Sequence, residues 1–216
     1  MAVYIESGRT RTFACAHDWP GWCRSGKDEA SALAALSAYA PRYAPVAKRA
    51  RLPFPTGAVE VRVSERIRGG ATTDFGAIEK VTKQDDKPVS KAEAERVAGL
   101  VSAAWAVFDG VVAGAPAALR KGPRGGGRDR DKIVEHVLSA EAAYVRKIGL
   151  KVPQPDGKDR AAVAAFHRAI LNTLRRPSKG GPLTEKGWPQ PYAARRIAWH
   201  ALDHAWEIED RSDPRG

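Results

Sequence analysis

The pattern of hydrophobic and polar positions changes near residue 88. Before it, short apolar segments alternate with polar residues at the period of two that is typical of strands. AVYIES, RTFACAH and WCRSG predict three short strands, and AVEVRVSERI predicts another strand with one solvated face. Between them, DEASALAALSAYAPRYA has the Ala and Leu content of a helix, which we expect to end at Pro41 and Pro45. The first half is therefore expected to combine strands with a helix.

After residue 88 the helical period takes over. Ser90 and Glu93 have the spacing of a capping box, which predicts a helix start, and this helix fades at Pro116. Three further amphipathic segments follow: DRDKIVEHVLSAEAAYVRKIG, KDRAAVAAFHRAILNTLRR and RRIAWHALDHAWEIED. Four such helices with connections of several residues predict a four-helix bundle over residues 89–216. Residues 69–88 are expected to link it to the first half.

The last helical segment carries His200 and His204, four residues apart among apolar residues. Side chains at this spacing share one helix face, so both imidazoles can reach one metal ion. Two imidazoles in a core also need partners for four ring nitrogens, and an ion supplies two of them at once. The alternative is a pair of core histidines without a metal, and the pair alone leaves both interpretations open.

A third histidine favours the metal. His136 lies in the second helical segment, on the inward stripe with Ile133 and Tyr144. Three protein ligands leave coordination positions open for water or substrate, as a catalytic ion requires. Glu207 shares the face of His204 and is a candidate to orient an imidazole or to accept a proton. The alternative for Glu207 is a surface acid on the last turn.

Other candidate sites are weaker. His167 has no partner in its own turn, so we expect a half-buried or exposed imidazole. Cys15, His17 and Cys23 lack a fourth ligand at finger-like spacing. Two cysteines in 216 residues do not suggest a disulfide-built secreted scaffold. With no signal-peptide pattern, and no apolar run near the roughly 18 residues that span a bilayer, we expect a cytoplasmic protein without a membrane partner.

The chain is basic, with a formal net charge of +11 and a pI of about 9.9. The one local concentration is RKGPRGGGRDRDK, residues 120–132, whose Gly and Pro content indicates a solvated loop. Charge alone gives only non-specific attraction to nucleic acid, and no aromatic residue is interleaved there for base stacking. A nucleic-acid partner is therefore not expected.

The segments KIVEHVLSAEAAYVRKIG and RRIAWHALDHAWEIEDR make the second half resemble the DinB/YfiT-type family of metalloenzymes. That family is a four-helix bundle in which three histidines hold a divalent ion, often nickel or zinc. One histidine comes from the second helix and two from an H-x-x-x-H in the last. By position, the resemblance implies His136, His200 and His204 as ligands. Family members include thiol transferases, a thiol-dependent isomerase and hydrolases.

The segment DWPGWCRSGKDEASALAAL, Asp18 to Leu36, makes the first half resemble the HicB-like antitoxin domain. The matching features are the D-x-P-G turn, the Gly a few residues on, and the acidic-to-aliphatic helix start. The resemblance implies a small β-β-β-α-β domain over residues 1–68, and hence an α+β chain with a DinB-like bundle behind it. No helix-turn-helix or ribbon module follows, which speaks against an antitoxin role. The domain would serve here as a lid, a dimerisation surface or a partner platform.

Two functions follow from these patterns. The first is a metal-dependent thiol transferase or hydrolase, acting on a small molecule such as a low-molecular-weight thiol. The second is a non-enzymatic binding or stress-response protein whose HicB-like domain holds a protein or RNA partner. No motif assigns a catalytic residue, and the oligomeric state stays open, with a homodimer as one alternative.

Overall fold

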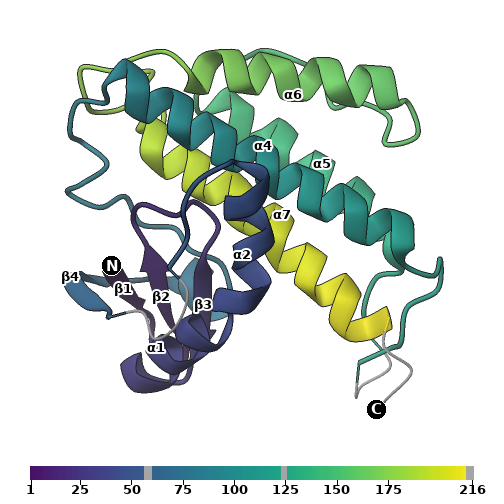
Figure 1. Ribbon diagram of the computed structural model, residues 1–216, viewed down its shortest axis with the longest axis horizontal. Helices are drawn as coiled ribbons and strands as arrows, with labels where there is room; N and C mark the ends of the chain where they lie inside the picture. The colour runs from purple at the N-terminus through teal and green to yellow at the C-terminus, as the bar shows by residue number, and fades with distance from the viewer. Residues whose placement is uncertain (56–59, 123–125, 213–216) are drawn as a thin grey trace.

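The computed structural model describes residues 1–55, 60–122 and 126–212, and these residues form a mixed α and β fold (Figure 1). The described strands are β1 (Ala2–Ser7), β2 (Thr12–Ala16), β3 (Cys23–Gly26) and β4 (Arg62–Arg68). They make one sheet in the order β3-β2-β1-β4. β1 runs antiparallel to β2 and parallel to β4. The predicted α+β class is therefore confirmed.

Both faces of the central strands are buried. Val3 and Ile5 belong to the main core, which is shared with the helices, whereas Tyr4 packs in a smaller cluster with Phe13 and Trp199. β4 is an edge strand whose exposure alternates along its length, as its predicted solvated face requires. The predicted strand position Val59 lies outside the described residues.

The helix expected to end at Pro41 and Pro45 ends earlier, at Ala38, and a second helix that the sequence did not predict contains both prolines. α1 (Glu29–Ala38) is followed after Tyr39 by α2 (Ala40–Arg49). Pro41 lies in the first turn of α2, where its missing N–H would have had no partner. Pro45 lies inside α2 and removes one helical hydrogen bond. The buried side chains of α2, among them Tyr43 and Val46, hold the helix against α4 despite that loss.

The four predicted helices of the second half all form. They are α4 (Lys91–Gly114), α5 (Arg130–Arg146), α6 (Arg160–Leu174) and α7 (Gln190–Ser212). Ser90 caps α4 by accepting a hydrogen bond from the backbone N–H of Glu93 at 3.2 Å, as the sequence predicts. α7 packs against both α4 and α5, and α4 also packs against α6 (Figure 1).

α4 is long and apolar enough, by length and composition, to cross a membrane. In this fold its apolar stripe, which includes Leu100, Val101 and Phe108, is buried against the neighbouring helices. The apolar side chains of α4 therefore form part of the protein core.

Residues 69–88, the predicted linker, carry α3 (Ala71–Phe75) and two buried anchors. Ile78 packs with Tyr4, Phe13 and Trp199. Asp85 is fully buried and forms an ion pair with Arg195 of α7, with 2.7 Å between Arg195 Nη2 and Asp85 Oδ2. This segment thus fastens α7 to the sheet.

Residues from the first half of the chain pack against one face of α7, and this packing fixes which way its other face points. Phe13 meets Trp199 edge to face at 6.1 Å, and Arg24 forms an ion pair with Asp203 at 2.8 Å. Gly21 has φ 90° and lies so close to Ala198 that a Cβ there would meet backbone atoms at 3.0 Å. With this face occupied, the side of α7 that carries His200 and His204 turns toward α5.

Candidate metal centre

The three predicted histidines come together between α5 and α7. His136, His200 and His204 each offer one ligand atom, and these atoms lie within 4.8 Å of one another. The ring centroids are 5.0 Å apart for His136 and His200, 4.9 Å for His136 and His204, and 4.7 Å for His200 and His204. Nitrogens that share one tetrahedral zinc ion are about 3.3 Å apart, so small rotamer changes would complete such a site.

Burial keeps two of the imidazoles in the neutral form that a metal needs. His200 is only 7% exposed, and desolvation lowers its pKa well below the ordinary imidazole range. Desolvation also lowers the pKa of half-buried His136, and the neighbouring charge of His204 adds to this shift. Both rings can therefore present lone pairs at neutral pH.

His204 is held by an acid from its own helix. Its Nδ1 donates a hydrogen bond to Glu207 Oε2 at 2.7 Å, and Arg211 donates to the other carboxylate oxygen at 2.6 Å. The hydrogen bond from His204 is the main cause of the lowered pKa of Glu207, so this carboxylate is ionised and can only accept. Nε2 of His204 is then left with its lone pair free, which is the usual arrangement for a metal-binding histidine.

The other two histidines lack hydrogen-bond partners among the described residues. Among the described residues, no side-chain hydrogen bond involves His136 or His200, and Nδ1 of His200 is buried without a partner. A buried polar nitrogen without a partner costs free energy, so such atoms are uncommon outside ligand sites. Three converging imidazoles with unmet hydrogen-bonding capacity fit a bound divalent cation.

The cluster is open on one side. His136 lines a surface cleft of about 560 Å³, together with Arg128, Lys132 and Gln154. Tyr144 closes the inner side, with its ring 5.8 Å from that of His200, and the guanidinium of Arg196 lies over the Tyr144 ring. The predicted basic loop, residues 120–132, contributes part of the cleft wall, although its residues 123–125 lie outside the described chain.

Sequence reasoning missed the partner of His167. The half-buried side chain is as expected, but its Nε2 lies 3.2 Å from Oε2 of Glu141, which belongs to α5. Trp105 of α4 donates to the other oxygen of Glu141 at 2.6 Å. These residues come from three helices, so no spacing within one helix could have revealed the contact.

The cysteines were also missed as a pair. Cys15 and Cys23 are opposite one another on β2 and β3 and form a disulfide. Because their sulfurs bond to each other, they offer no thiolate site with His17. The signal was available in principle, since residues directly opposite on neighbouring antiparallel strands are close enough to be bridged.

No family model, curated protein or solved structure matches this chain, so what it binds must be judged from its own residues.

Proposed function

We propose that the protein is a divalent-metal-dependent enzyme of the DinB/YfiT type, a thiol transferase or hydrolase acting on a small molecule. The ion, zinc or nickel, would be held by His136, His200 and His204. The observation that carries this proposal is the meeting of three imidazoles beside an open cleft, two of them without a hydrogen-bond partner in the described part of the chain.

The ligand count favours catalysis over a structural role. Structural zinc sites are closed by four protein ligands, whereas catalytic sites use three and keep one position open. The cluster has three members among the described residues, and Glu207 points its carboxylate at His204 Nδ1 rather than into the cluster. An ion there would lower the pKa of a bound water or stabilise a thiolate.

The chain's own groups have separate tasks in this proposal. Glu207 and Arg211 fix the orientation and tautomer of His204. Arg128 lines the cleft without an ion pair to a described residue and would attract an anionic substrate such as a thiolate to the side of His136, whereas Lys132 is already paired with Glu135 at 2.9 Å. Imidazole ligands suit both zinc and nickel, so the donor set alone does not choose between them.

A cytoplasmic location belongs to the same proposal. Disulfides are rare in that compartment, so the proposal implies that Cys15 and Cys23 are reduced there, although the structure joins them.

The first test is metal content. The full chain, purified without a His tag or chelator, should contain about one divalent ion per chain by elemental analysis. His200→Ala and His204→Ala should each lose the ion. His167→Gln is the matched control, because it changes a histidine on another helix and should keep the ion. An ion-free wild-type protein that does not take up zinc or nickel would refute the proposal.

The second test is turnover. The metal-loaded protein is assayed with low-molecular-weight thiols plus electrophiles, and with ester and amide substrates. Turnover that disappears in His200→Ala supports the proposal. A bound ion without turnover on this panel rejects the transferase or hydrolase assignment. Specific retention of RNA or a protein partner by an ion-free chain would favour the binding protein instead.

A further inference from the structure

Two arginines without an acidic partner flank the three histidines. Arg128 lines the cleft on the open side, beside His136. Arg196 lies on the inner side, where its guanidinium is over the ring of Tyr144 and donates to the carbonyl oxygen of Ile78. In the described part of the chain neither arginine forms an ion pair with a carboxylate. The cluster of imidazoles is therefore bordered by positive charge on two sides.

Both charges act on the histidines themselves. Desolvation is the main cause of the lowered pKa of His200, and the neighbouring histidines, Arg196 and Arg128 lower this pKa further. At His136 the charge of Arg128 contributes to the lowered pKa after desolvation and His204. Because Coulomb energy falls with distance and is screened by water, the guanidinium of Arg128 must lie near the cluster to have this effect.

The acids of the cleft already have cationic partners. Glu135 pairs with Lys132 at 2.9 Å, and Asp129 pairs with Lys121 at 2.6 Å. Each pair has little net charge, so neither acid offsets Arg128.

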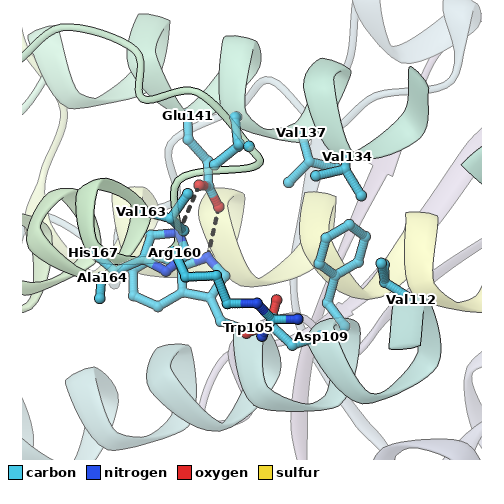
Figure 2. A pocket seen from close by; sticks show the side chains of 13 residues that line it. Trp105, Asp109, Val112, Val134, Val137, Glu141, Arg160, Val163, Ala164 and His167 are labelled. Carbon is cyan, nitrogen blue, oxygen red and sulfur yellow. Dashed lines mark hydrogen bonds and ion pairs between the residues drawn. The ribbon is translucent and has the colours of Figure 1, made fainter. Parts of the chain in front are cut away.

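The carboxylates of α7 and α5 near the cluster have partners too. Glu207 uses one oxygen for His204 and the other for Arg211. Glu141 lies on the opposite face of α5, where a pocket opens between α4, α5 and α6, and two protein donors occupy its oxygens (Figure 2). The described residues therefore leave the charge of Arg128 uncompensated.

A bound ion would increase this excess of positive charge. The described ligands are three histidines, which bind a metal as neutral imidazoles and so leave both charges of a divalent ion in place. Like charges in one site repel, and the repulsion between the ion and Arg128 is relieved if an anionic group lies between them. A coordination position left open by three protein ligands gives room for such a molecule.

We propose that the small-molecule substrate of this centre carries a carboxylate, which Arg128 binds while the reacting end of the substrate faces the three histidines. This assignment rests on the proposed function and names the class of molecule on which it acts. The planar guanidinium of arginine matches a carboxylate with two parallel hydrogen bonds. The cleft of about 560 Å³ has room for a molecule that reaches both groups, and Ser139 and Gln154 line it with uncharged polar groups.

Other substrate charges fit less well. A cationic substrate would add to the positive charge of the ion and Arg128. A neutral substrate would leave Arg128 without a partner and would not offset the charge of the ion. Charge at the end of the molecule remote from the ion is therefore expected to set the selectivity of the cleft.

The test uses the full chain loaded with cobalt(II), whose visible absorption changes when a thiolate binds to the ion. The two main probes, 3-mercaptopropionate and 3-mercaptopropionamide, have the same length and the same thiol, and they differ only in the charge of the other end. At pH 7 the acid should bind roughly tenfold more tightly than the amide, because its hydrogen bonds to Arg128 are charge-assisted. The cationic probe 2-aminoethanethiol should show no gain over the amide.

Variants assign the preference to Arg128. Arg128→Gln should bind the acid and the amide alike. Lys132→Gln is the matched control, because it removes a cleft charge that is already paired with Glu135, and it should keep the preference. If the carboxylate only chelated the ion, the preference would persist in Arg128→Gln.

A second measurement needs no thiol. In a buffer without carboxylates, Arg128→Gln should bind cobalt at least as tightly as the wild type, because a repelling charge is removed. Competition with a chromophoric chelator measures this affinity. A merely structural role of Arg128 would instead weaken cobalt binding.

The proposal is overturned if the wild type binds the acid and the amide alike, or if Arg128→Gln keeps the preference. It is equally overturned if Arg128→Gln binds cobalt more weakly than the wild type. The metal proposal survives these outcomes, because cobalt is bound in each of them. A wild-type chain that takes up no cobalt would overturn both proposals, and elemental analysis before the titrations separates that case.

Discussion

The histidines on the two faces of α5 differ in whether they have hydrogen-bond partners. On one face His136 meets His200 and His204, and neither His136 nor His200 has a hydrogen-bond partner from the described protein. On the other face Glu141 receives both Trp105 and His167. The difference teaches that burial alone does not identify a ligand site. What marks the first face is hydrogen-bonding capacity that none of the described residues uses.

The same contrast has an energetic side. A satisfied buried network contributes to stability and loses it when one member is removed, because the remaining partners are left unpaired. A site kept ready for a ligand costs stability until the ligand binds. Substitutions on the two faces of α5 should therefore change unfolding free energy in different directions.

The largest expected effect is on the Glu141 face. Glu141→Ala should lower the free energy of unfolding by about 3 kcal/mol, because it leaves the buried Trp105 N–H unpaired and opens a cavity. His200→Leu in the metal-free protein should change it by less than about 1 kcal/mol, or increase it, because it removes a buried nitrogen without a partner. Urea unfolding of both variants measures this, and equal losses would remove the contrast between the faces.

The next effect is on metal affinity. His136→Ala should weaken zinc binding roughly 100-fold or more, since it removes the one ligand that α5 supplies. Competition with a chromophoric chelator measures the affinity. Glu141→Gln, on the other face of the same helix, serves as the control and should bind zinc as the wild type does. Retained affinity in His136→Ala would mean that α5 is not part of the site.

A smaller effect is expected at the residue that orients His204. Glu207→Ala should weaken zinc binding about tenfold, because His204 loses the acceptor for Nδ1. Glu209→Ala is the matched control, two residues on, where the acid instead pairs with Arg42. If both substitutions had the same effect on zinc affinity, Glu207 would act only through its surface charge.

The smallest effect concerns acid. Burial lowers the pKa of His200 in the folded state, so the unfolded chain takes up this proton more readily. Stability of the metal-free protein is therefore complete above the ordinary imidazole pKa of about 6.5, and it falls as the pH drops below that value. One such group changes the unfolding free energy by at most about 1.4 kcal/mol per pH unit. Between pH 7 and 5, the free energy of unfolding should depend less on pH in His200→Leu than in the wild type. An unchanged dependence on pH would contradict this assignment.

Much of the local structure could be predicted because its causes are local. The period of apolar residues placed α4, α5, α6 and α7, and the capping serine at residue 90 marked a helix start. The error at Pro41 and Pro45 has a tertiary cause. Their intrinsic preference to break a helix is offset by the packing of Tyr43 and Val46, which no window of sequence shows.

The candidate metal centre was predictable for a similar reason. His200 and His204 are neighbours on one helix, so their spacing already set their geometry. His136 was added by its place on an inward stripe and by resemblance. The contact of Glu141 with Trp105 and His167 had no such signal, because each residue belongs to a different helix.

The sequence by itself determined the four helices of the second half, the strands and the face of α7 on which two imidazoles stand, because periodicity and turn chemistry act over a few residues. Only the tertiary structure decided which face of α5 meets that pair of imidazoles and which face, carrying Glu141, packs against α4 and α6. That choice depends on how α7 is fixed by Asp85, Phe13 and Gly21 from the other half of the chain. Contacts between residues far apart in sequence leave no periodic pattern in either segment.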